Sequence, residues 1–176
     1  MDNLTLPVLL LLAGCASTNA YGYTRTYEPL SDEEPYAEHV VDVSYEDVRR
    51  NPEALKGTMI AWFGTVVSVD AQGSHARVTM DERFHQERHQ CSDEFESSCR
   101  VTIMPKEGGP FTAELNILPE HAQGRDRIAP GSLLKVYGHV EDRFDDRGGP
   151  VLRIDYYRHF PAGTYVIAGS GGRMRR

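Results

Sequence analysis

Residues 59–70 read MIAWFGTVVSVD, and this stretch decides the fold class. It is long, apolar and rich in β-branched residues, which is typical of a β-strand. Gly64 lies inside it, and a glycine within a strand commonly marks a bend or a bulge. The turn sequence AQGS follows at 71–74, and residues 75–80 then alternate between polar and apolar side chains. The stretch therefore predicts a bent strand that continues into a β-hairpin.

Four more segments downstream carry a strand pattern. They cover residues 100–104, 111–117, 134–140 and 152–157. Within the third of them, Gly138 is a second glycine inside a strand. About five long strands with internal glycines predict a small closed sheet, because closure removes exposed edges and glycines permit sharp bends. We expect an all-β domain, a five-stranded barrel of the OB type. An open β-sandwich is the alternative.

The segments before and between these strands carry turn and helix signals. Ser44 begins SYED, which is typical of an N-cap, and predicts a short helix that is interrupted near Asn51 and ends by Gly57. Residues 106–110 read as a turn, and 119–130 as a polar connection with one helical turn.

The N-terminus resembles a bacterial lipoprotein signal. The apolar run at 4–13 is too short to span a bilayer but fits the hydrophobic region of a signal peptide. It ends in LAGC at 12–15, which resembles the lipobox, in which the cysteine takes a diacylglycerol and becomes the new N-terminus. The region before the run departs from the pattern, since it carries Asp2 and no Lys or Arg. We therefore expect lipidation at Cys15, with acyl chains such as palmitate holding the protein to a membrane.

The composition of the chain divides it into four parts. Residues 1–14 are the predicted signal peptide, and 15–40 a flexible lipidated tether without an apolar period. Within that tether, the run DEE at 32–34 is interpreted as a solvated charge cluster. Residues 41–161 are assigned to the barrel domain, and 162–176 to a Gly- and Arg-rich tail.

Several segments of the barrel domain resemble the Slp family of outer-membrane lipoproteins. They are NPEALKG at 51–57, IAWFGTV at 60–66, GSLLKVYG at 131–138 and the aromatic stretch at 156–161 that ends in proline. The resemblance implies an OB-type domain, an envelope location and a role in starvation or envelope stress without catalysis. The sorting rule of such lipoproteins implies the outer membrane, because no Asp follows Cys15; the inner membrane is the alternative.

Cys91 and Cys99 enclose the polar segment SDEFESS. In an exported protein the oxidising compartment favours a disulfide between them. The alternative is a metal site, in which His85 and His89 share one face of a helix and the two cysteines complete a zinc set. The short spacing between His89 and Cys91 disfavours that alternative, so no metal or other cofactor is expected.

Three functions remain open from the sequence. The first is a non-enzymatic envelope lipoprotein with a structural or stress-related role. The second is an OB-type module that binds a glycan or a peptide or protein partner through an aromatic face; its candidate residues are Trp62, Tyr137, Tyr156 and Tyr157. The third is a metal-handling protein. We expect no enzyme, since no catalytic motif is present. A net charge of −7 makes a nucleic acid an improbable partner.

Overall fold

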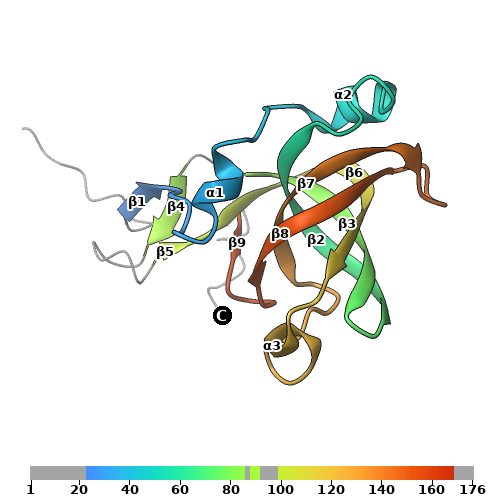
Figure 1. Ribbon diagram of the computed structural model, residues 1–176. Helices are drawn as coiled ribbons and strands as arrows, with labels where there is room; N and C mark the ends of the chain where they lie inside the picture. The colour runs from blue at the N-terminus through green and yellow to red at the C-terminus, as the bar shows by residue number, and fades with distance from the viewer. Residues whose placement is uncertain (1–22, 86–87, 92–98, 169–176) are drawn as a thin grey trace, which may run out of the picture.

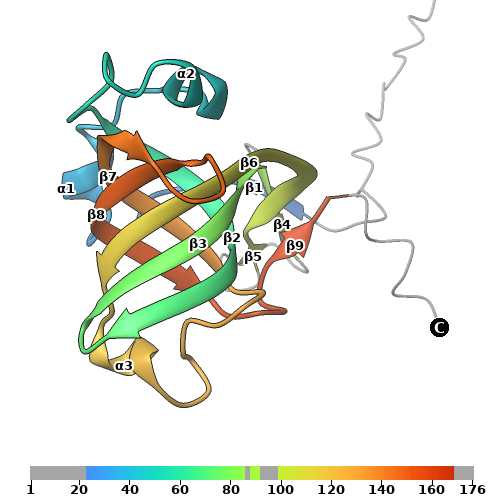
Figure 2. The same cartoon turned by 90° about the vertical axis from the view of Figure 1, so that its right-hand side faces the viewer.

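The computed structural model describes residues 23–85, 88–91 and 99–168, and most of them are strands. In chain order the elements are β1 (Tyr23–Thr26), α1 (Glu34–Ala37), α2 (Tyr45–Arg50), β2 (Met59–Gln72), β3 (His75–His85), β4 (Arg88–Cys91), β5 (Cys99–Arg100), β6 (Thr102–Asn116), α3 (Pro119–Ala122), β7 (Leu133–Phe144), β8 (Pro150–Phe160) and β9 (Val166–Ile167). Figures 1 and 2 show how they are arranged.

Five long strands close into a barrel. β2 pairs with β3 and β7, β3 with β6, and β7 with β8, all antiparallel, while β6 and β8 pair in parallel and complete the ring. A three-stranded meander followed by a hairpin that returns to both of its edges is the arrangement of an OB-type barrel. The predicted five-stranded barrel is therefore confirmed, and the alternative of an open sandwich is wrong.

Apolar side chains from alternate strand positions fill the barrel. Val66, Met80, Phe111, Val136 and Leu152 are among the buried residues that form one cluster inside it. The alternation predicted for the start of β3 is confirmed, because every second residue there is buried and the residues between them are partly or fully exposed.

Two short helices lie at opposite ends of the barrel (Figure 1). α2 begins after Ser44, whose side-chain oxygen accepts a hydrogen bond from the Asp47 backbone N–H at 3.2 Å, so the predicted N-cap is confirmed. Tyr45 and Val48 turn from α2 into the barrel core. α3 is the single helical turn expected after β6. Among the described residues, no helix is long and apolar enough to cross a membrane.

The turn predicted at 106–110 is wrong, since β6 runs without a break from Thr102 to Asn116. The strand bends there instead. Its register with β3 shifts on both sides of Arg83, and Gly109 has a φ of +152°. Because β3 accompanies β6 on both sides of this point, the two glycines at 108 and 109 produce a bulged bend rather than a reversal.

The two predicted strand glycines lie where a side chain would not fit. A Cβ atom on Gly64 would come within 2.7 Å of the Met80 side chain and 2.8 Å of the Phe111 ring. A Cβ on Gly138 would lie 2.4 Å from the Arg153 carbonyl oxygen, at a register shift between β7 and β8. The interpretation that these glycines permit irregular strands is confirmed at Gly138.

Residues 27–37, called the strap below, cross the outer face of β2, β7 and β8 before the chain reaches α2. Within the strap, Glu33 has no exposed surface, so the predicted solvated cluster at 32–34 is wrong for this residue. Its neighbours Asp32 and Glu34 are exposed. A single carboxylate can be buried here because tyrosine hydroxyls and Arg158 surround it.

Short strands from both ends of the described chain lie at one side of the barrel. β1 pairs with β4 and β4 with β5 in a small sheet, and β9 pairs in parallel with the first residues of β6. The predicted tail thus begins with residues that join the barrel sheet. A second apolar cluster lies here; it contains Phe63, Val101, Ile103, Leu133 and Phe160.

Candidate functional site

The four aromatic residues predicted to form a ligand face do not share an exposed face. Trp62 and Tyr157 point into the barrel, where the indole N–H donates to the Val43 carbonyl at 3.1 Å. Tyr137 lies on the outer face but is buried beneath the strap. Tyr156 is partly exposed and stacks on Tyr36 of the strap, with ring centroids 5.0 Å apart. An aromatic binding platform is therefore absent from these positions.

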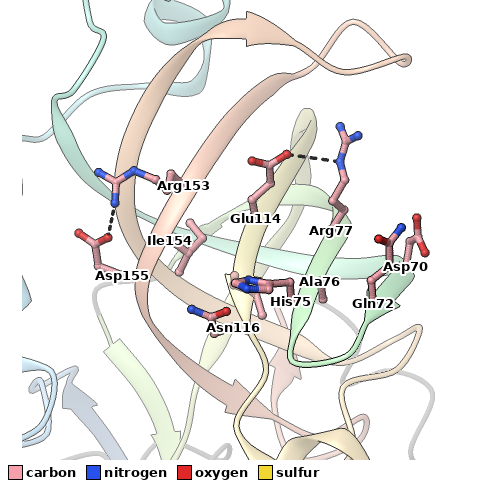
Figure 3. A pocket seen from close by; sticks show the side chains of 11 residues that line it. Asp70, Gln72, His75, Ala76, Arg77, Glu114, Asn116, Arg153, Ile154 and Asp155 are labelled. Atoms are coloured by element: carbon pink, nitrogen blue, oxygen red, sulfur yellow. Dashed lines mark hydrogen bonds and ion pairs between the residues drawn. The ribbon is translucent and has the colours of Figure 1, made fainter.

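An open groove lies elsewhere, between the β2–β3 hairpin, the end of β6 and the middle of β8 (Figure 3). Its volume is about 610 Å³, which is the size of small-ligand sites in proteins. Its apolar floor consists of Ala76, Leu115 and Ile154, which are buried. In OB-type barrels this side, formed by the second and third strands and the loop between the first two, is where oligonucleotides and oligosaccharides bind.

Apart from Asp70, the charged side chains of the groove are paired with one another or with Arg143. Arg77 lies 3.4 Å from the Glu114 carboxylate, and Arg153 donates to Asp155 at 2.9 Å. Figure 3 shows these two pairs on opposite walls. Arg143 also forms an ion pair with Glu114 from the end of β7. The groove therefore presents paired charges rather than a field of one sign.

Four polar side chains near the hairpin end of the groove are unpartnered. They are Asp70, Gln72, His75 and Asn116, which are exposed and make no side-chain hydrogen bond or ion pair with the described residues. A carboxylate, two amides and an imidazole together offer both donors and acceptors. These groups are available to a ligand without loss of an internal contact.

The β7–β8 loop covers the rest of this barrel side. Asp145 accepts from the Thr112 hydroxyl at 2.7 Å and from the backbone N–H of Arg147 and Gly149. Arg147 also reaches Asp81 on β3 at 3.0 Å. These contacts hold the loop over β3 and β6 around Asp81 and Thr112. The groove lies beside this region and is not covered by the loop.

The predicted cysteine pair is aligned by the backbone. Cys91 in β4 and Cys99 in β5 are directly opposite each other in an antiparallel register. The seven residues between them, and the side chains of both cysteines, lie outside the described part of the structure. The disulfide itself therefore stays a prediction, but opposite positions of an antiparallel pair have the Cα separation that a disulfide needs.

The alternative metal site receives no support from the residues that are described. His85 ends β3, and its ring stacks on Phe63 at a centroid distance of 4.6 Å. His89 lies in the separate strand β4, so the two histidines do not share a helix. Among the described residues no group of three or more His, Cys, Asp or Glu could hold a metal ion. The side chains of His89 and the cysteines are outside that set.

A buried carboxyl that the sequence did not reveal lies at the α2 end of the barrel. Glu82 on β3 follows the inward-facing positions of the strand and is 5% exposed. The Gly108 backbone N–H donates to its carboxyl group, but Oε2 is buried without a partner among the described residues. Burial raises the pKa of Glu82 from 4.5 to about 7. This group affects stability rather than the groove.

Fold and groove together define an OB-type barrel with a ligand-sized groove beside its β2–β3 hairpin. No family model, curated protein or solved structure matches this chain.

Proposed function

We propose that the protein is a non-enzymatic, lipid-anchored binding module of the bacterial envelope, and that its groove takes a neutral glycan. The observation that carries this proposal is the set of four unpartnered polar side chains above an apolar floor. Sugar hydroxyls need mixed donors and acceptors, and the C–H faces of a sugar ring pack against apolar side chains. The groove offers both.

The charge of the groove favours a neutral ligand over an anionic one. Its arginines are engaged by carboxylates, so an anionic ligand would have to break those pairs. No Phe, Tyr or Trp lines the groove, so stacking of nucleic-acid bases has no such platform there. A neutral glycan can instead bind through hydrogen bonds to the polar side chains and contacts with the apolar floor.

The envelope location is proposed from the sequence. The lipobox LAGC at 12–15 and the resemblance to the Slp family both support a lipoprotein, with the outer membrane as its location and the inner membrane as the alternative. A structural or stress-related role, as the resemblance implies, is compatible with glycan binding by the groove.

Removing two polar side chains of the groove is expected to weaken glycan binding. We expect amide resonances of residues that line the groove to shift when triacetylchitotriose is titrated into the Cys15→Ala chain. Gln72→Ala with Asn116→Ala should weaken binding about tenfold or more, because each lost hydrogen bond to a ligand contributes on the order of 1 kcal/mol. Gln123→Ala removes an exposed amide outside the groove and should leave the affinity unchanged. A titration that shifts no groove resonance would contradict the neutral-glycan proposal.

Lipidation at Cys15 is expected to determine membrane attachment. Two acyl chains suffice for stable anchoring at about 0.8 kcal/mol for each buried CH₂ group. The wild-type chain expressed with an export signal should incorporate a fatty-acid probe and fractionate with membranes. Cys15→Ala should do neither, while Cys91→Ala should behave as the wild type. Label on the Cys15→Ala chain would show that the anchor lies elsewhere.

A disulfide between Cys91 and Cys99 is expected in the exported protein. The chain-entropy model gives roughly 2.6 kcal/mol for so short a loop, so reduction should lower the free energy of unfolding by a few kcal/mol at most. Intact-mass measurement with and without alkylation under non-reducing conditions distinguishes the disulfide from two free thiols. Two free thiols after oxidative export would be incompatible with the bond, and stoichiometric zinc released by a thiol reagent would favour the metal alternative.

A further inference from the structure

The strap is held on the barrel by few side chains. Tyr36 stacks on Tyr156, and Tyr27 contacts the Phe63 ring edge-to-face at 5.9 Å. α1, which forms the second part of the strap, has no buried residue, and Leu30 is 49% exposed. Glu33 is the only strap residue that is buried. The attachment therefore depends on this carboxylate and two aromatic rings (Figure 1 shows α1 beside the barrel).

The barrel side of this contact is called the socket and consists of Phe63, Lys135, Tyr137 and Arg158. Within it the Glu33 carboxylate accepts hydrogen bonds from Arg158 at 3.1 Å and from the Tyr137 hydroxyl at 3.4 Å. The strap itself supplies two more donors, the Tyr27 hydroxyl at 2.5 Å and the Leu30 backbone N–H at 2.8 Å. A fully desolvated carboxylate is thus satisfied from several directions, as a buried charge requires.

The socket carries more positive charge than the strap neutralises. Lys135 is 9% exposed, and its ammonium group lies 3.9 Å from the centroid of the Tyr27 ring and 4.8 Å from that of Tyr137. No carboxylate among the described residues lies within ion-pair distance of Lys135. Burial lowers its pKa to about 8. One carboxylate therefore faces two cations, and a cation held over aromatic rings is an incomplete substitute for an ion pair.

We propose that the socket is an interaction surface for an acidic segment of a partner protein, and that the strap occupies it as an internal substitute ligand. The strap shows the chemistry that fits: a carboxylate with an aromatic residue a few positions to either side. A partner segment with a second acidic group could also pair with Lys135, which the strap leaves over aromatic rings. Tyr156, which is partly exposed beside Tyr137, extends the same face and offers it an aromatic contact.

The test uses the full chain with Cys15→Ala and adds Glu33→Arg, which should eject the strap by charge repulsion from Arg158 and Lys135. Glu34→Arg, with the same charge change at an exposed neighbour, is the matched control. The probe is a fluorescent peptide of residues 23–40, followed by anisotropy. We expect the Glu33→Arg chain to bind it at least about tenfold more tightly than the Glu34→Arg chain and the parent. Lys135→Met with Arg158→Met should remove that binding.

Specificity and folding are checked in the same experiment. A scrambled peptide of equal charge should bind at least about tenfold more weakly than the native order, and so should the peptide with glutamine at position 33. Hydrogen exchange should show faster exchange of strap amides and unchanged exchange in β7. A released strap on a folded barrel that binds no peptide would overturn the proposal, and equal binding of the scrambled peptide would do so too. If Glu33→Arg does not fold, Glu33→Gln is subjected to the same comparison.

Discussion

Replacing Glu82 with glutamine is expected to raise the free energy of unfolding by about 3 kcal/mol above pH 8 and to leave it nearly unchanged below pH 4.5. The pKa of Glu82 in the folded chain is raised from 4.5 to about 7, because burial disfavours the charged carboxylate. Each pKa unit corresponds to about 1.4 kcal/mol, so the shift is equivalent to about 3 kcal/mol. Glutamine keeps the shape of the side chain but cannot ionise.

The direction of this pH dependence of the free energy of unfolding follows from proton binding. Since the folded state holds this proton more tightly than the unfolded chain, the favourable contribution of Glu82 is complete below pH 4.5 and is lost as the pH rises through about 7. Urea unfolding at a series of pH values measures the difference between wild type and Glu82→Gln. Glu46→Gln, at an exposed position of α2, should show no such difference. A Glu82→Gln chain that is less stable than wild type at pH 8 would mean that the ionised carboxylate has a partner.

Gly138→Ala is expected to lower the free energy of unfolding by about 3 kcal/mol. The added methyl group would lie 2.4 Å from the Arg153 carbonyl oxygen and 2.9 Å from the Ile154 Cα. Both atoms belong to the backbone of β8, so no side-chain rotation relieves the contact, and overpacking of this kind costs on the order of 1–3 kcal/mol or more. The strands would have to separate where β7 and β8 change register.

Thermal and urea unfolding of Gly138→Ala against wild type measures this effect. Val67→Ala is the control, because Val67 lies on β2 and is 42% exposed. It should stay within about 0.5 kcal/mol of wild type. If Gly138→Ala were as stable as its control, the close approach of β7 and β8 at this point would be wrong.

The barrel could be predicted from the sequence because its signals are local. Alternation along β3 and at the end of β6, and glycines at 64 and 138, report strands and bends directly. The turn expected at 106–110 failed because KEGGP has turn composition, whereas the pairing of β6 with β3 on both sides of it is a long-range property. Local propensity was overridden there by the closed sheet.

The groove and the socket could not be predicted, because they unite residues from distant strands. Asp70 and Asn116 come to line the same groove only through the pairing of β3 with β2 and β6. Polar residues around the hairpin turn at 71–74 were the one signal available. No sequence signal marked Glu33 as buried, because a buried carboxylate between two exposed acidic residues looks in the sequence like part of a solvated run. The aromatic residues were chosen by type, yet two of the four fill the barrel interior.

Docking of the N-terminal segment has a consequence for how far the domain stands from a bilayer. If Cys15 carries the lipid, the first described residue, Tyr23, follows only eight positions later, and from there the chain is paired in β1 and packed as the strap. Eight residues span at most about 28 Å even when fully extended. The segment between the lipidated cysteine and β1 is therefore only about a third as long as residues 15–40 would be if that whole range were free. The barrel would then lie close to the lipid surface and reach only ligands that are near that surface.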